Sequence, residues 1–176
     1  MIQTYIDQMH QALDTFPVNE IQQVINILSE AKMKHRQVFL MGNGGSASTA
    51  SHFATDLMRN THRFKVMCLS DNISTITAYA NDYCYEDVFI YPLVGLCTPR
   101  DTVIGISTSG KSRNIIRAIE YSNQIGAVTI GLTGYGGGEL GRIASVHLNI
   151  PCGVIEQIED AHLIIAHMIA KELREQ

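Results

Sequence analysis

The sequence predicts an α/β fold built on a parallel, doubly wound sheet. Five short segments are hydrophobic at nearly every position, which is typical of parallel strands buried on both faces. Segments with helical character lie between most of them, as in repeated strand–helix units. Glycine and hydroxyl residues follow several of these strands, at the sheet edge where such folds bind ligands.

The elements follow in order from the apolar spacing. In the first 36 residues apolar positions recur at helical intervals, and Pro17 divides the pattern into two amphipathic helices. Strands are predicted at 38–41, 66–69, 103–106, 128–132 and 146–150. Helices are predicted at about 47–60, 74–96 with a break near Asn81, 114–125 and 155–175. We interpret 1–176 as a single domain, with N-terminal helices over about 1–36, an α/β core over about 37–151 and a C-terminal helix over about 155–175.

The composition narrows the classes of protein. Of 176 residues, 45% are apolar and 17% are charged, which indicates a well-packed globule rather than a disordered chain. The formal net charge of −4 gives no basic surface for nucleic acid, and no apolar run approaches the ~18 residues of a membrane span. The four cysteines form no C-x-x-C pair and the N-terminus lacks the apolar block of a signal peptide. We therefore expect a soluble, cytoplasmic protein with reduced thiols and no membrane or nucleic-acid partner.

Three predicted strands run into loops rich in glycine and hydroxyl residues: GNGGSAS at 42–48, STSGKS at 107–112 and TGYGGG at 133–138. Clustered glycines let backbone N–H groups turn toward one point, and a helix that begins behind them favours an anion. Together the loops predict a site for a small phosphorylated ligand. The alternative is that they are ordinary tight turns whose hydroxyls cap helices.

Two nucleotide-binding interpretations of these loops are weaker. GNGGSA fits the relaxed dinucleotide fingerprint, and Asp71 stands about where its acid belongs, but that fold has no use for a second hydroxyl-rich loop. GISTSGKS has the spelling of a P-loop, yet Gly105 and Ile106 continue the strand, and no later strand ends in an acid to hold magnesium. Magnesium-dependent ATP binding would revive the P-loop interpretation, and we predict none.

GNGGSAS followed by HFATDL, together with GISTSGKS, resembles the sugar isomerase (SIS) domain family, and within it the sedoheptulose 7-phosphate isomerases, also called phosphoheptose isomerases. The resemblance extends over nearly the whole chain. It implies a flavodoxin-like three-layer sandwich with a five-stranded parallel sheet. It also implies a homotetramer whose active sites are shared between subunits.

The resemblance assigns roles by position. It implies phosphate contacts from Ser107, Thr108, Ser109 and Ser112. It implies further substrate contacts from Asn43, Gly44, Gly45, Asn81, Asp82 and Glu159. It implies one zinc ion per site, with His52, Asp56, Glu159 and His167 as the ligands. It gives the acid–base chemistry to Asp56 and His167.

The chemistry of the candidate site residues can also be assessed independently of the family resemblance. His52 and Asp56 are four apart and share a helix face, as two metal ligands or a hydrogen-bonded surface pair would. His167 has apolar neighbours, where a lone histidine is more often a core residue than a ligand. The acidic cluster that precedes it, which includes Glu159, is costly to bury without a use. His162 is the less favoured alternative to His167.

Two positions depart from the family. Family isomerases carry glutamate where this chain has Asp56, and glutamine where it has Glu159. A base shortened by one methylene stands about 1 Å farther from its proton, and a displacement of that size costs on the order of a hundredfold in rate. The added anion at Glu159 suits a cation site. Because of these two departures, the sequence does not fix the substrate or the catalytic rate. The prediction of a phosphosugar pocket is unaffected.

The expected function is an aldose–ketose isomerase that converts sedoheptulose 7-phosphate to D-glycero-D-manno-heptose 7-phosphate through an enediol, for heptose biosynthesis. The alternative is a non-catalytic SIS protein that binds a phosphosugar or a regulatory partner such as a replication initiator. That branch lacks a carboxylate at position 56, so the presence of Asp56 favours the enzyme.

Overall fold

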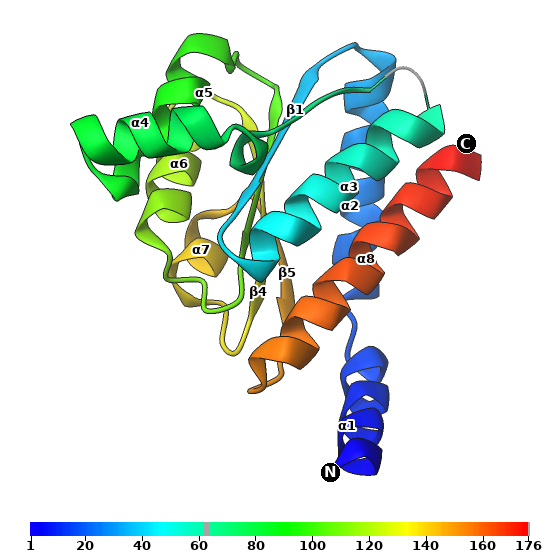
Figure 1. Cartoon of the computed structure of the whole chain (residues 1–176). Helices are drawn as coiled ribbons and strands as arrows, with labels where there is room; N and C mark the ends of the chain where they lie inside the picture. Colours follow the sequence, from blue (N-terminus) through cyan, green and yellow to red (C-terminus); the bar gives the residue numbers. More distant parts are fainter. Residues whose placement is uncertain (62–63, 176) are drawn as a thin grey trace.

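The computed structural model describes residues 1–61 and 64–175. A five-stranded sheet in the order β2-β1-β3-β4-β5 lies between two layers of helices (Figure 1). Every strand pairing is parallel. The predicted three-layer α/β fold is therefore confirmed. The strands are β1 Gln37–Gly42, β2 Lys65–Cys68, β3 Thr102–Ser107, β4 Val128–Gly134 and β5 Val146–Ile150.

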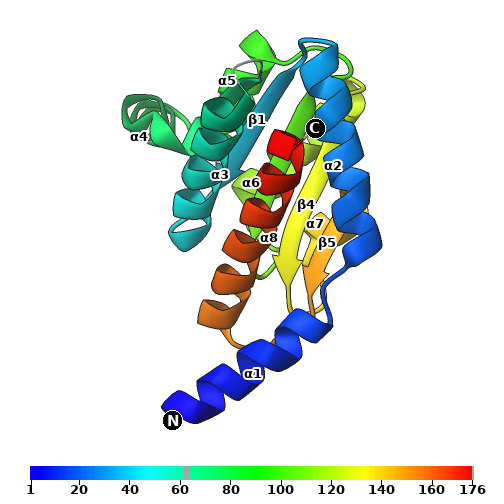
Figure 2. The same ribbon diagram turned by 90° about the vertical axis from the view of Figure 1, so that its right-hand side faces the viewer.

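The helices divide between the two faces of the sheet, and α1 extends away from the body (Figures 1 and 2). One layer holds α2 (Val18–Met33), α3 (Gly45–Thr61) and α8 (Ile155–Glu175). The other holds α5 (Ile90–Leu96), α6 (Arg113–Gln124) and α7 (Gly138–Ile143). The remaining helices are α1 (Ile2–Asp14) and α4 (Ile73–Asp82), with short 3₁₀ turns at Leu69–Asp71 and Tyr85–Asp87. Sequence reasoning missed α7, because six residues are too few to show a helical period.

Alternate side chains of β1 enter different hydrophobic cores. Val38 and Leu40 join the cluster beneath α2, α3 and α8, whereas Phe39 and Met41 join the one beneath α5 and α6. All four are fully buried, and a side chain of this size stabilises the fold by roughly 1.5–3 kcal/mol. Burial on both faces explains why the strands read as continuous apolar runs.

The strand order places a topological switch beside β1. From β1 the chain moves outward to the edge strand β2, then crosses back to β3 on the other side of β1. The loops after β1 and β3 therefore lead to helices on opposite faces and leave a crevice between them, which is where open α/β sheets bind ligands. The helices that follow these two loops are α3 and α6.

The start of α8 is tied to α1 by polar contacts. The Tyr5 hydroxyl donates to Asp160 Oδ2 at 2.6 Å, and the Gln157 amide donates to Gln8 Oε1 at 2.8 Å. The hydrogen bond to the Asp160 carboxylate raises the pKa of Tyr5 to about 12. Within the described residues, no helix is both long enough and apolar enough to cross a membrane.

Candidate active site

A cavity of about 280 Å³ opens at the predicted crevice, between the loops that follow β1 and β3. It contains seven of the residues that the sequence predicted for the site, from two loops and from α8. The described residues that line it are Asn43, Gly44, Gly45, Ser46, Ile106, Ser107, Thr108, Ser112, Ile155 and Glu159.

Helix N-termini converge on this cavity. The loop after β1 leads into α3 at Gly45, Ser112 immediately precedes α6, and α8 begins at Ile155. Each N-terminus presents unpaired N–H groups and the positive end of a helix dipole, which together bind anions. The Ser107 and Ser112 hydroxyls lie 3.0 Å apart and supply side-chain hydrogen bonds. Because the described lining includes no lysine or arginine, the backbone carries the attraction for an anion.

The third glycine loop, TGYGGG, does not line this cavity but lies behind the second loop. The Gly134 N–H donates to the Thr108 carbonyl at 2.8 Å, and the Leu140 N–H donates to the Gly110 carbonyl at 2.9 Å. Gly110 adopts a left-handed φ of 62° against the Gly137 carbonyl. The expectation that all three loops face the ligand is corrected: two line the cavity, and the third supports one of them.

Three predicted substrate contacts lie outside the lining of this cavity. The Ser109 hydroxyl accepts from the Lys111 N–H at 3.2 Å, within its own loop. Asn81 and Asp82 are exposed at the end of α4, where the Asn81 amide donates to the Asp82 carboxylate at 2.9 Å. Their roles in binding stay predictions.

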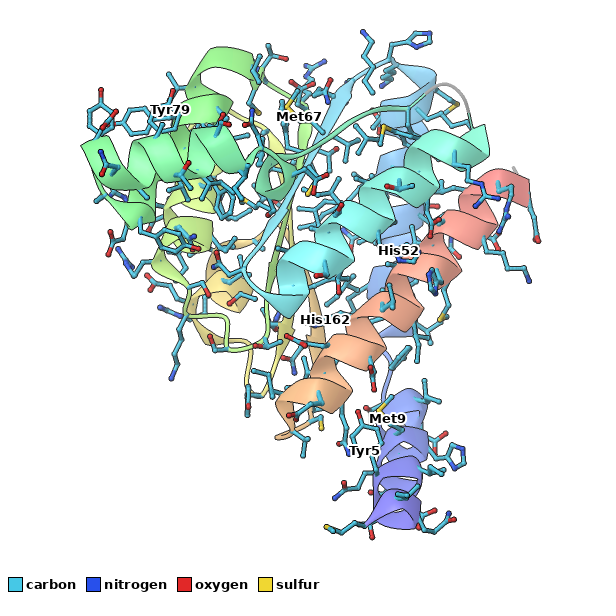
Figure 3. All side chains as sticks on the ribbon, in the orientation of Figure 1. Tyr5, Met9, His52, Met67, Tyr79 and His162 are labelled. Atoms are coloured by element: carbon cyan, nitrogen blue, oxygen red, sulfur yellow. The ribbon has the colours of Figure 1, made fainter. Side chains whose placement is uncertain are left out.

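A cluster of two histidines and a carboxylate forms where α3 and α8 pack side by side, and Figure 3 labels His52 of this cluster. His52 Nε2 lies 3.2 Å from His167 Nε2, and Asp56 Oδ2 lies 3.5 Å and 3.7 Å from these two nitrogens. Both histidine side chains are half exposed, whereas that of Asp56 is 18% exposed. The apolar neighbours of His167 suggested a core position, but the structure places its ring at the surface beside His52.

The cluster fits a zinc ion by donor type and spacing. Zinc favours imidazole nitrogen and carboxylate oxygen, and ligands at its usual bond lengths in a tetrahedron lie roughly 3.3–3.5 Å apart. The three donor atoms lie close to those separations. Glu159 is not part of this group: it stands eight residues before His167 on α8, about 12 Å along the helix axis, and lines the cavity instead.

Glu159 places a negative charge inside the cavity between the loops that follow β1 and β3, called the anion cavity below. Its carboxylate packs against Gly45 so closely that a Cβ at that position would overlap the carboxylate oxygens. Gly45 also begins α3, and the positive end of that helix dipole favours the carboxylate there. The same helix ends that would hold a ligand anion thus already face a protein anion.

The cavity and the cluster lie along one pair of helices. His52 follows Gly45 by seven residues on α3, which is about 10 Å along the helix axis. A second cavity, of about 580 Å³, borders this stretch of α3 and is lined in part by Ser48, Ser51 and His52. The cavity between the loops and the edge of the cluster are thus about two helical turns apart along α3.

His162, the alternative to His167, is a core residue. It is labelled in Figure 3 and is fully buried, and its Nε2–H donates to the Thr133 carbonyl at 3.0 Å. Its Nδ1 has no partner among the described residues. Burial lowers the pKa of His162 to about 4, because the charged ring would lose its hydration. It therefore remains neutral at pH 7.

His162 should make the stability of the fold pH-dependent. Its folded-state pKa lies below the ordinary value of 6.5, so the unfolded chain binds the proton first as pH falls. Neutral His162 makes its full contribution to the free energy of unfolding above pH 6.5. That contribution falls by roughly 3 kcal/mol as the pH decreases from 6.5 to 4. Denaturant unfolding of the wild type and His162→Gln across this window measures the difference in slope. Equal slopes in the two proteins would contradict the assignment.

The largest of the cavities described here lies elsewhere. It measures about 690 Å³, and Figure 3 labels Met67 and Tyr79 of its lining. Aliphatic and aromatic residues there are mixed with the polar residues Asp71, Asn72 and Thr75. None of its lining residues belongs to the predicted site. The predicted site residues therefore do not gather at the cavity of greatest volume.

The chain is similar to known proteins over most of its length. Residues 4–134 match the SIS domain family. The chain is 35% identical over 182 residues to a phosphoheptose isomerase of Syntrophotalea carbinolica, covering 99% of this chain and 93% of that protein. It is 34% identical over 160 residues to a phosphoheptose isomerase of Aquifex aeolicus, covering 89% of this chain and 84% of that protein.

Solved structures are similar over the whole length. The phosphoheptose isomerase of Neisseria gonorrhoeae superposes with a TM-score of 0.92 at 28% identity, covering 99% of this chain and 95% of that one. A phosphoheptose isomerase of Francisella tularensis gives the same TM-score of 0.92 at 27% identity, covering 99% of this chain and 97% of that one.

Proposed function

The chain belongs to the SIS domain family and is an isomerase of the phosphoheptose isomerase type, and from this premise we propose that it converts sedoheptulose 7-phosphate to D-glycero-D-manno-heptose 7-phosphate. The observation that carries the proposal is the pairing of an anion cavity with an acid–base cluster on the same two helices. A heptulose phosphate carries its phosphate and its carbonyl toward opposite ends of the carbon chain, so each can meet one of these two features.

Asp56 and His167 perform the proton transfers in this proposal. The Asp56 carboxylate removes a proton from the hydroxymethyl carbon next to the carbonyl, the electron pair of that C–H bond forms a C=C double bond, and the carbonyl oxygen takes a proton to give the enediol. His167 then supplies a proton to the former carbonyl carbon, while the hydroxyl on the first carbon gives up its proton and becomes the aldehyde of the aldose. The two side chains are close enough to act on adjacent atoms, since Asp56 Oδ2 lies 3.7 Å from His167 Nε2.

His52, Asp56 and His167 would hold the proposed zinc ion. With Nε2 of His167 on the metal, the proton that His167 supplies would come from its Nδ1–H, and Asp56 would act through its second oxygen. A bound zinc ion would polarise the substrate oxygens and stabilise negative charge that develops on them. The protein's own part is to hold the two imidazoles and the carboxylate close together on facing helices.

The loops at the cavity anchor the phosphate. Ser107, Thr108 and Ser112 supply hydroxyl and backbone donors, and the N-termini of α3 and α6 supply the positive potential. Binding energy from this non-reacting end of the sugar holds the carbonyl end in register, which raises the rate of the chemical step. Asn43, Gly44 and Gly45 complete this binding surface.

The test is an NMR or coupled assay of the purified protein with sedoheptulose 7-phosphate, with and without added zinc. Turnover to the aldose supports the proposal. Binding without turnover at saturating zinc would instead favour a non-catalytic phosphosugar-binding protein. This second function is favoured by two departures from the family isomerases: Asp56 is one methylene shorter than their glutamate, and Glu159 is charged where they carry glutamine.

The proposal extends to assembly and location. We propose a homotetramer, because Ile2, Ile6 and Leu13 of α1 remain exposed on a helix that extends from the body (Figure 2), and burial of such apolar surface drives association. We also propose that the whole chain, 1–176, acts as one SIS domain in the cytoplasm, where its four unpaired cysteines would stay reduced. Light scattering on wild type and Ile6→Lys would test the assembly.

Replacing Glu159 with glutamine should tighten substrate binding. The carboxylate shares the cavity with the phosphate, and repulsion across a partly solvated site is worth about 1 kcal/mol, or roughly fivefold in Kd. Calorimetric titration of sedoheptulose 7-phosphate measures the change, with Glu156→Gln on the exposed face of α8 as the matched control. Weaker binding by Glu159→Gln would mean that the carboxylate contacts sugar hydroxyls.

A further inference from the structure

The Asn43 carboxamide is held by two residues that sequence reasoning did not single out. Asn43 Nδ2 donates to Asn114 Oδ1 at 3.0 Å, and Asn114 Nδ2 donates back to Asn43 Oδ1 at 3.0 Å. The Tyr85 hydroxyl donates to the same Asn43 Oδ1 at 2.8 Å. The three residues come from the loop after β1, the start of α6 and the 3₁₀ turn at Tyr85–Asp87, so the contacts join three separate parts of the chain.

The orientation of both amides follows from the backbone. The Ile115 N–H donates to Asn114 Oδ1 at 3.0 Å, which identifies that atom as the oxygen. Asn114 is 3% exposed, so its side chain is fixed by packing as well as by this bond. Reciprocal pairing then leaves Asn43 with a single arrangement: its oxygen accepts twice and one of its N–H groups donates to Asn114.

The second N–H of Asn43 has no acceptor among the hydrogen bonds of the described residues. Asn43 lines the anion cavity next to Gly44 and Gly45. Because every other hydrogen-bonding capacity of the carboxamide is committed to the protein, this N–H is the group that Asn43 can offer to a ligand. A carboxamide held on both sides loses little freedom when it binds, which favours affinity and a defined ligand position.

We propose that Asn114 and Tyr85 are positioning residues for the reaction, which hold the Asn43 carboxamide so that its free N–H donates to the sugar phosphate. The proposal rests on the proposed function, because it takes the ligand to be that substrate. It also gives the segment next to Asn81 and Asp82 a direct connection to the cavity, through the Tyr85 hydroxyl. An ion pair of 2.8 Å between Asp87 and Arg117 holds that turn against α6.

A double-mutant cycle tests whether Tyr85 acts through Asn43. In the wild-type background Tyr85→Phe should lower kcat/KM for sedoheptulose 7-phosphate about threefold to tenfold, the range for one neutral hydrogen bond. In an Asn43→Ala background the same change should have almost no further effect, because the group that Tyr85 positions is gone. Equal losses in both backgrounds would overturn the proposal. Tyr121→Phe, on α6, is the matched control and should leave kcat/KM unchanged.

Asn114→Leu and Asn114→Asp extend the cycle. Leucine has a similar shape but removes both bonds to Asn43, so it should lower kcat/KM by tenfold or more, and more than Tyr85→Phe does. Aspartate keeps the acceptor oxygen for Ile115 and Asn43, but it loses the donor and adds an anion beside the cavity, so it should lower kcat/KM further than leucine does. A leucine variant with wild-type kcat/KM would count against positioning by the reciprocal amide pair.

Hydrogen exchange of the Asn43 carboxamide gives a readout that does not depend on turnover. In the wild type one of its two N–H signals should exchange slowly, and Tyr85→Phe and Asn114→Leu should each accelerate that exchange. Fast exchange of both signals in the wild type would overturn the proposal even if the enzyme is active. If the wild type neither binds nor converts sedoheptulose 7-phosphate, the proposed function fails, while the exchange rates still decide whether Asn43 is held.

Discussion

Asp56→Asn is expected to lower kcat by between a hundredfold and ten-thousandfold, the range that a positioned general base contributes. Asparagine keeps the shape of the side chain but cannot accept the substrate proton. The side chain of Asp56 is only 18% exposed and lies within 3.7 Å of both histidines, so the exchange should perturb the chemistry far more than the packing. The assay is turnover of sedoheptulose 7-phosphate at saturating zinc.

Two controls separate loss of the base from loss of the metal. Bound zinc is measured on the same samples, because asparagine also removes a charged ligand from the His52–Asp56–His167 cluster. Asp56→Glu restores the carboxylate that the family resemblance places here and should give a kcat at or above that of the wild type. An Asp56→Asn protein that retains wild-type kcat would remove Asp56 from the mechanism.

The fold was predictable because the apolar pattern is strong. Strands buried on both faces admit only apolar residues, so β1 to β5 were found within a few residues of their ends. The closing helix was placed at its observed bounds, since its apolar face recurs over 21 residues. By contrast α7 is too short to show a period, and its place behind the second loop depends on contacts between loops that are distant in sequence.

The candidate site was predictable only where a single short segment of sequence contains the pattern that indicates it. Glycine and hydroxyl clusters at strand ends located the cavity, and the spacing of His52 and Asp56 placed them on one helix face. The exposure of His167 could not be read from its apolar neighbours, because it depends on where α3 crosses α8. Asn114 and Tyr85 carried no signal of their own, since only the fold brings them to Asn43.

Gly110→Ala is expected to destabilise the protein by about 3 kcal/mol or more and to disable the phosphate loop. Gly110 has a φ of 62°, which costs a residue with a Cβ about 1–2 kcal/mol. The added Cβ would also overlap the Gly137 carbonyl, which is backbone and cannot rotate out of the way. At 2–4 °C per kcal/mol for a domain of this size, Tm should fall by roughly 10 °C.

The loss of function should exceed what instability alone explains. Gly110 sits between Thr108 and Ser112, and its carbonyl accepts from the Leu140 N–H at 2.9 Å, so displacement of the loop moves the phosphate donors directly. KM should therefore rise at a temperature where the variant is still folded. Gly136→Ala is the matched control, because a Cβ there meets no atom within 4 Å, and it should leave Tm and KM unchanged. A Gly110→Ala protein with a lowered Tm but an unaltered KM would show that this loop does not bind the phosphate.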